Sequence, residues 1–480
     1  MQMERNKMMK THTLLAFSAL ALLAAGTACS NKVETAKQVL KPRIVVMTDI
    51  GPAEVEPDDN ESAVRLLAYA DRFEIEAIIT SIGWNCDPYP EEWSVYLTRV
   101  IDAYQTDVQN LMKRSNQQSF NSINEEQKQQ ALGYWPSADY IRSRAMMGSK
   151  RAGIGVIGDD NNSPGSDFLI RLADEDDDRP IWLCSWGGAN TFAQAVWRVK
   201  QERSADELKK FLNKFRLYTI TDQDMQYSMR MNRAYSSHQW LRRDYPFDLL
   251  MIWDESAWLN QNELGKSNWD KYASQIQGKG AMGKVYPNFL WGVEGDTPSF
   301  LNVMPNGLNN PDDPTQIGWG GCHQFEVSPD GDTYAWTNWN QPLKDISNAY
   351  ERKFYPDEFN DFAARMQWAD TGDGNHNPVA VVNGSQNLNP LNISARAGQM
   401  LKFDASKSFD ADGDKLSFNW WFQQFPDETG YPEIKNPESA KVSFTVPDSS
   451  QGNIYHLICE IHDNGPFSLT AYRRVIISVE

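Results

Sequence analysis

The sequence predicts an α/β domain with a mostly parallel sheet flanked by helices, followed by an all-β sandwich. Between residues 43 and 253, short apolar runs alternate with amphipathic helical patterns, as in parallel sheets covered on both faces. Beyond about residue 370, short alternating runs are separated by Asp, Gly and Pro turns, which is typical of antiparallel sandwiches. The chain has 480 residues and 41% apolar residues, so it can build two or three domains with sizeable cores.

The first 28 residues have the pattern of an export signal. A basic segment (residues 5–10) precedes a short apolar segment (residues 14–25), and small residues lead to Cys29. The apolar segment is too short to span a membrane. Cys29 in this setting resembles the acylated cysteine of bacterial lipoproteins. A plain secretory signal cut just before Cys29 is the alternative.

An acylated Cys29 predicts a protein of the cell envelope, at the outer membrane or in the periplasm, tethered by residues 29–42. Secretion is the alternative. The rest of the sequence contains no run of 18 apolar residues, so no membrane-spanning helix is predicted there. The net charge of −18 becomes −20 without the signal, because the signal carries three basic side chains and one acidic side chain. An acidic chain argues against nucleic-acid binding and suits divalent cations.

The α/β domain is predicted over residues 43–372. Its first strand covers residues 44–47 and is followed by a helical pattern at residues 62–68. Further strands are predicted at residues 75–80, 180–184, 215–220 and 247–253, with a helix at residues 189–200. Ligands of such sheets bind beyond the carboxyl ends of the strands. The acidic loop after the first strand is therefore the expected place of a site.

The sandwich is predicted over residues 396–480, after a segment at residues 373–395 that contains the linker and its start. Its strands are predicted at residues 401–404, 416–422, 442–446, 455–461 and 472–479. Residues 409–420 resemble a segment of the immunoglobulin-like domains of bacterial extracellular enzymes. We interpret Asp410, Asp412 and Asp414 in that segment as an Asp-Gly turn, with calcium binding as the alternative.

Carboxylates crowd the loop after the first strand. Asp49 ends the strand, and Asp58 and Asp59 follow within ten residues. Such carboxylates repel each other unless a cation lies among them, and hard oxygen ligands suit Ca²⁺ or Mg²⁺. The alternative is an exposed acidic loop in which Asp58 or Asp59 caps the next helix. The loop alone does not distinguish the two interpretations.

Four segments resemble those of nucleoside hydrolases. Residues 46–51 with the Asp58–Asp59 pair resemble the Asp-Pro-Gly-x-Asp-Asp signature, and residues 80–85 resemble a strand that ends in Gly-Asn. Residues 182–190 resemble a strand-turn-helix segment, and residues 292–297 fall where the family has a late Asp. Together with the sandwich, their order resembles a subgroup of exported, nucleoside-hydrolase-like proteins of polysaccharide-degrading bacteria, described as cellulose-binding.

The resemblance implies a calcium site. Its ligands would be Asp49, Asp59, the main-chain carbonyl of Trp186, and Asp296. Asp49 would also be the catalytic base that takes a proton from calcium-bound water. N-glycoside cleavage of this kind passes through an oxocarbenium-like state.

The resemblance also implies a sugar site beside the calcium. Asp58 would orient a ribose hydroxyl, Asn85 would help hold the sugar, and Glu294 is assigned to the same site. Fifteen of the 17 Trp residues precede residue 372, which places aromatic stacking near this pocket rather than on the sandwich. Trp84 and Trp186 are predicted to contact the sugar. Trp182 and Trp253, inside apolar strands, are predicted to be core.

Two departures from the family pattern bear on activity. Six residues, 52–57, stand where the signature has one, so the Asp pair is expected to be displaced. Family members that act on nucleosides often carry a His just before the late Asp, where it protonates the leaving base; Gly295 is found here. His238 and His323 are the remaining candidates for a proton donor.

The sequence thus predicts hydrolysis of a ribosyl or other glycosyl compound at a calcium-centred pocket. The alternative is a non-catalytic accessory protein that binds a cellulose-like polysaccharide. A structural envelope protein that holds calcium for stability is a third hypothesis. No nucleic-acid partner is expected, and contact with a membrane is expected through the lipid anchor only. No disulfide is predicted among the four later cysteines.

Overall fold

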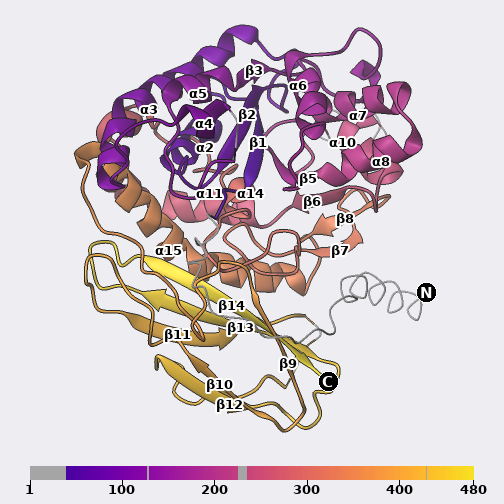
Figure 1. Ribbon diagram of the computed structural model, residues 1–480. Helices are drawn as coiled ribbons and strands as arrows, with labels where there is room; N and C mark the ends of the chain where they lie inside the picture. The colour runs from indigo at the N-terminus through magenta and orange to yellow at the C-terminus, as the bar shows by residue number, and fades with distance from the viewer. Residues whose placement is uncertain (1–38, 127–128, 225–234, 427, 429) are drawn as a thin grey trace, which may run out of the picture. The chain divides into compact units, whose positions relative to one another are not determined.

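The computed structural model describes residues 39–126, 129–224, 235–426, 428 and 430–480 (Figure 1). The predicted signal peptide, the lipidation residue Cys29 and most of the predicted tether lie outside the described residues. Within the described residues, no helix is both long enough and apolar enough to cross a membrane. The four cysteines in this part of the chain are free thiols.

The α/β part alternates strands and helices, as the sequence predicts. Its strands are β1 (Arg43–Thr48), β2 (Glu74–Thr80), β3 (Ala145–Met147), β4 (Ile181–Ser185), β5 (Phe215–Ile220), β6 (Leu250–Asp254), β7 (Gln324–Val327) and β8 (Tyr334–Thr337). Its longer helices are α2 (Pro57–Ala68), α3 (Ser94–Arg114), α6 (Pro164–Ala173), α7 (Asn190–Glu202), α8 (Ala205–Lys214), α10 (Ser237–Asp244), α11 (Ala257–Ser267) and α15 (Leu343–Thr371). Shorter helices are η1 (Glu91–Trp93), α4 (Ser122–Glu126), α5 (Ala138–Ser143), η2 (Ile154–Val156), α12 (Trp269–Gln275), α13 (Gly280–Val285) and α14 (Pro298–Leu301).

The eight strands form one sheet in the order β3-β2-β1-β4-β5-β6-β8-β7. Neighbouring strands are parallel except β7, which pairs antiparallel with β8. The predicted mostly parallel sheet is therefore confirmed. Strand β1 lies between β2 and β4, with Met47 opposite both Ile79 and Ser185. The loops that follow these three strands consequently meet at one edge of the sheet.

Helices cover both faces of this sheet (Figure 1). Ile44 and Val46 of β1 pack in a core with residues of α2, α3 and α15, whereas Val45 and Met47 pack in a second core with residues of α6, α7, α8 and α10. All six residues of β1 are buried. A strand buried on both faces needs apolar residues at consecutive positions, which explains the continuous apolar run in the sequence.

The C-terminal part is a β-sandwich, as predicted. Its strands are β9 (Leu391–Ala395), β10 (Met400–Asp404), β11 (Ser417–Phe422), β12 (Lys441–Thr445), β13 (Ile454–His462) and β14 (Thr470–Val479). One sheet has the order β11-β13-β14-β9 and the other pairs β10 with β12. Trp420, Phe403 and Phe444 lie in the core between them.

Some elements differ from the sequence-based expectation. Strand β6 begins at Leu250, and Phe247, placed in that strand by the sequence, lies in the preceding loop with 76% of its surface exposed. Helix α15 was not predicted, although it has 29 residues and ends at Gly372 in the left-handed conformation (φ 71°). Trp182 and Trp253 are buried in β4 and β6, as predicted.

Candidate functional site

The insertion in the loop after β1 folds into a tight turn. The N–H of Glu56 donates to the Pro52 carbonyl at 2.9 Å. Asn60 Nδ2 donates to the carbonyls of Gly51 and Glu56 at 2.8 and 2.7 Å. Helix α2 then begins at Pro57, five residues before the helical pattern predicted at residues 62–68. The turn brings Glu56 inward, next to the residues at the end of β1.

Buried carboxyl groups gather at the carboxyl end of β1. The group comprises Asp49, Glu56, Asp58, Asp59 and Asp296. None of them is more than 7% exposed. Oxygens of Glu56, Asp58 and Asp59 lie within 4.8 Å of one another, and Thr48 Oγ1 donates to Asp59. The alternative of an exposed acidic loop is therefore wrong, because both aspartates are buried in the first turn of α2 and the N-cap residue is Glu56.

Burial and mutual repulsion raise the pKa values of these acids. Burial raises the pKa of Asp49 well above its usual range, and the charges of Asp59 and Asp58 raise it further. The pKa of Glu56 rises to about 12 through burial and the charges of the three neighbouring aspartates. Burial raises the pKa of Asp59 to about 7. The pKa of Asp296 is raised by burial and then by Asp59. Of the charges that act on each acid, the main ones are therefore the negative charges of the other acids in the group.

The residues present fit a divalent cation. Asp49 Oδ2, Asp58 Oδ1 and Asp296 Oδ2 are buried and have no hydrogen-bond partner. Buried ionised carboxylates need either a proton or a cation to offset the loss of hydration. Carboxylate oxygens are the ligands that Ca²⁺ and Mg²⁺ prefer. The predicted ligands Asp49, Asp59 and Asp296 thus lie in one cluster, despite the insertion before the Asp pair.

The fourth predicted ligand comes from the turn after β4. The Trp186 carbonyl accepts a hydrogen bond from Gln223 Nε2 at 2.8 Å. The next residue, Gly187, lies against Asp49, since a Cβ atom built there would be 3.0 Å from Asp49 Oδ1. A Cβ on Gly83 would be 1.5 Å from Asp49 Oδ2, so glycine is required at this position as well. The loops after β2 and β4 therefore enclose the Asp49 carboxylate.

Two predicted sugar contacts are turned away from solvent. The Trp186 indole is buried, donates to Ser299 Oγ at 2.8 Å and packs against Phe300. The Glu294 carboxylate is buried and forms an ion pair with Arg65 at 2.5 Å. Neither side chain has a surface open to a sugar. We therefore do not retain the Trp186 ring or Glu294 as sugar contacts.

Other residues of the loop after β2 do reach the surface above the carboxylates. Asn85 is exposed, and its Nδ2 donates to Glu56 Oε1. Trp84 is 38% exposed. Trp93, which the sequence did not single out, lies against Gly51, because a Cβ there would be 2.5 Å from its ring. Asn85 thus contacts Glu56 and the partly exposed Trp93 contacts the loop before it, while Trp84 adjoins Asn85 in the chain; we call these three residues the rim of the acidic site.

Asn262 of α11 lies beside Gly295, where the resemblance to nucleoside hydrolases predicts a proton donor. A Cβ on Gly295 would lie 2.8 Å from Asp58 Oδ2 and 2.9 Å from Asn262 Nδ2, so a His at 295 would not fit this arrangement. The two His candidates have other surroundings. His238 Nε2 accepts the N–H of Ala189 at 2.9 Å. His323 packs edge-on against the Tyr218 ring and lies 3.7 Å from Asp254.

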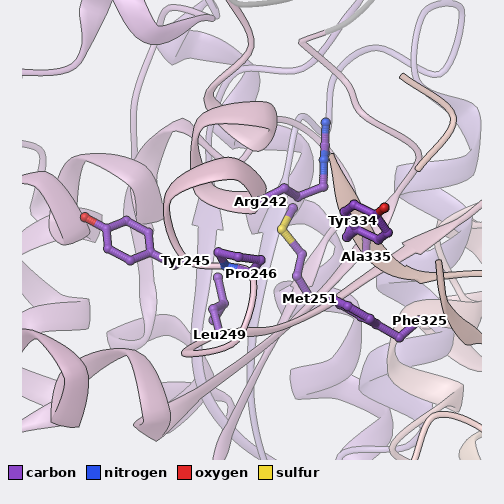
Figure 2. Close-up of a pocket in the computed structure, with 8 residues that line it drawn as sticks. All are labelled: Arg242, Tyr245, Pro246, Leu249, Met251, Phe325, Tyr334 and Ala335. Carbon is purple, nitrogen blue, oxygen red and sulfur yellow. The ribbon is translucent and has the colours of Figure 1, made fainter. Parts of the chain in front are cut away.

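A hollow in another part of the α/β domain lies between α10, β6 and the β7–β8 pair. Mainly apolar and aromatic side chains line it, as Figure 2 shows. Its charged lining residue, Arg242, pairs with Asp222 and Asp330 at 2.9 Å each. Because this charge is already neutralised, we assign the chemistry to the carboxylate cluster and not to this hollow.

Both parts of the chain are similar to known protein families. Residues 43–323 match the family model described as cellulose-binding Sde182, nucleoside hydrolase-like domain. The chain belongs to this family. Residues 400–479 match the model of the C-terminal domain of the cellulose-binding protein Sde0182. No curated protein matches the chain.

A solved structure resembles nearly the whole of this chain. It is a nucleoside hydrolase-related hypothetical protein from Saccharophagus degradans, associated with carbohydrate metabolism. It is 33% identical, with a TM-score of 0.77, over 92% of this chain and 100% of that chain. A PKD domain from the KIAA 1837 protein is 22% identical over 19% of this chain and 81% of that chain, with a TM-score of 0.15.

Proposed function

We propose that this protein binds a carbohydrate at a calcium-dependent site at the carboxyl end of β1. The observation that carries the proposal is the set of buried, unpartnered carboxylate oxygens on Asp49, Asp58 and Asp296. Bound Ca²⁺ would neutralise these carboxylates and offer coordination positions to the vicinal hydroxyls of a sugar.

The rim supplies the remaining contacts of a sugar site. The exposed amide of Asn85 can donate to and accept from sugar hydroxyls. Trp84 and Trp93 would offer indole faces for stacking, and the Asp58 carboxylate would accept a hydrogen bond from a sugar hydroxyl. A polysaccharide is the ligand class we favour, because the family is described as cellulose-binding and the similar structure as associated with carbohydrate metabolism.

We place this binding at the cell envelope. The basic and apolar segments before Cys29 support export, and acylation of Cys29 would keep the protein at a membrane surface. A polysaccharide outside the cell would then be within reach. Labelling of the full-length protein with a fatty-acid probe in a bacterial host, with and without Cys29→Ala, checks the anchor.

Retention on insoluble cellulose and other glucans tests the proposed function. With calcium, the full chain is expected to be retained, and EDTA or Asp49→Asn is expected to release it. Asp139→Asn, which changes an exposed acid on α5, is the matched control and is expected to behave like the unchanged protein. If calcium raises thermal stability but no glycan retains the protein, the site has a structural role and the proposal fails.

Hydrolysis of a glycosyl compound is the second candidate function. It is favoured by Asp49, whose buried Oδ2 has no partner and whose place matches that of the family's base. In this reaction Asp49 would accept the proton of the attacking water, while Asp58 and Asn85 hold the sugar. Asn262 occupies the proton donor's place and cannot protonate a leaving group, so substrates with stable leaving groups are the best probes.

A panel of nucleosides and activated glycosides, assayed with calcium, tests this second function. Product release by the unchanged protein and none by Asp49→Asn would support it. Retention on a glycan without turnover of any compound in the panel would leave carbohydrate binding as the function.

A further inference from the structure

A second group of acidic side chains lies in the sandwich, in the loop between β10 and β11. Oxygens of Asp410, Asp412 and Asp414 lie within 4.8 Å of one another. Asp410 Oδ1 accepts the N–H groups of Asp412 and Asp414 at 2.7 and 3.3 Å, so the loop is the Asp-Gly turn that the sequence predicts. A turn of this kind needs no ion, and these three acids alone do not make a site.

Asn375, in the segment after α15, supplies an independent observation. Its side chain is only 6% exposed, and its Nδ2 donates to Asp463 Oδ2 and to the Pro466 carbonyl, both at 3.0 Å. Its Oδ1 has no partner. A Cβ built on Gly465 would lie 2.7 Å from this oxygen and 2.2 Å from Asp414 Oδ2. Asn375 Nδ2 lies 2.6 Å from the same point, so the Asn375 amide lies beside Asp414 of the acidic loop.

The acids around this point outnumber the bases. Asp410 Oδ2 is buried and unpartnered, and the pKa of Asp463 is raised by burial and further by the charge of Asp410. Two basic side chains lie close by. The N–H and ring Nδ1 of His376 contact Asp412 at 2.7 and 2.9 Å, and Arg114 donates to the Asn375 carbonyl at 2.5 Å. These bonds go to Asp412 and to the main chain of residue 375, so they do not satisfy Asp410 Oδ2.

We propose that side-chain oxygens of Asp410, Asp414 and Asn375 bind a calcium ion, with Asp412 and Asp463 beside it. Carboxylate and amide oxygens on loops suit Ca²⁺, and the set contains no thiolate or free imidazole that would favour zinc. The ion would join the segment after α15, the β10–β11 loop and the turn between β13 and β14. It would thus hold the start of the sandwich to two of its loops, independently of the site at β1.

Calcium stoichiometry of the full chain tests this proposal. Equilibrium dialysis is carried out on the protein with Asp59→Asn, so that the site at β1 is already impaired. Adding Asp410→Asn is expected to remove one further bound ion per chain or to weaken its binding at least tenfold. Asp448→Asn, an exposed acid elsewhere in the sandwich, is the matched control and is expected to change nothing.

A second pair of variants keeps the test decisive if Asp410→Asn fails to fold. Asn375→Leu removes the unpartnered amide oxygen without changing any charge, and is expected to lose the same ion. Asn375→Asp retains an oxygen at this position and is expected to keep the ion. Unchanged stoichiometry and affinity in a folded Asp410→Asn variant, or in Asn375→Leu, would overturn the proposal.

Discussion

Helix α2 carries buried charged side chains at both ends, and the two ends differ in whether these charges have a partner of opposite sign. Near its last turn, Arg65 forms an ion pair with Glu294 at 2.5 Å, and Tyr286 also donates to Glu294 at 3.0 Å. In its first turn, Asp58 and Asp59 face other acids, and their pKa values are raised. A buried charge that is paired within the chain needs no partner from outside it. A group of buried carboxylates without a basic partner needs protons or a bound cation.

The Arg65–Glu294 pair at the C-terminal end of α2 gives the largest expected effect of a substitution on stability. Arg65→Leu would leave Glu294 buried without its ion pair, which typically costs about 3–5 kcal/mol. We expect the free energy of unfolding, measured in urea, to fall by this amount. The control is Arg142→Leu, because Arg142 pairs with Asp102 and Asp139 on the surface and such pairs contribute at most about 1 kcal/mol. Equal losses in the two variants would contradict the contrast.

Glu351 is a buried acid whose hydrogen-bond donors are neutral, so it is intermediate between the paired Glu294 and the unpaired acids at the start of α2. Burial and the charge of Asp254 raise the pKa of Glu351 to about 7, although Ser347 Oγ donates to it at 2.7 Å. The folded state therefore binds this proton more tightly than the unfolded state. Its contribution to stability is complete below pH 4.5 and is lost as the pH rises to 7.

The expected loss is about 3 kcal/mol, since each unit of pKa shift corresponds to about 1.4 kcal/mol. Glu351→Gln removes this titration. The difference in unfolding free energy between Glu351→Gln and the unchanged protein is measured at pH 4.5 and pH 7.5. It should shift by about 3 kcal/mol in favour of the variant. A difference that does not change with pH would show that Glu351 has an ordinary pKa.

The unbalanced end of α2 predicts a response to calcium. At a calcium concentration 100-fold above Kd, binding stabilises the folded state by about 2.7 kcal/mol. Asp59→Asn should abolish this gain, while removing one repelling charge should leave the calcium-free protein at least as stable as before. Thermal unfolding with calcium and with EDTA, in an Asp410→Asn background, isolates this site. A full calcium response in Asp59→Asn would contradict its role as a ligand.

Much of the α/β part could be predicted because its strands are buried on both faces. Residues 44–47 are all apolar, which fits a strand in the middle of a sheet that is covered on both faces. The acidic residues that follow the strand must therefore lie at the edge of the sheet. Helix α15 gave no such signal. It packs against α3, α11 and α13, and its Tyr350 and Phe354 contact Trp421 of the sandwich. Buried on several sides, it lacks the single apolar stripe that identifies an amphipathic helix.

The site was predictable where a residue's role depends on its strand and not where it depends on distant contacts. Asp49 had to lie at the end of β1. The direction of the Trp186 ring depends on Ser299 and Phe300, more than 100 residues later. Glu56 enters the cluster only because the insertion closes as a turn. Trp93 reaches the rim only because Gly51 leaves room for its ring.

The rim gives the smallest expected effect, because Trp84 acts on the ligand and not on the fold. Trp84 is 38% exposed, so Trp84→Ala should change the unfolding free energy little. An aromatic face stacked on a sugar contributes about 1 kcal/mol, so affinity for a soluble glucan oligosaccharide should fall roughly fivefold. Trp339, which is 43% exposed and follows β8 near the far edge of the sheet, is the matched control. If Trp339→Ala weakens binding and Trp84→Ala does not, the sugar binds away from the unbalanced carboxylates, and calcium and carbohydrate are not parts of one site.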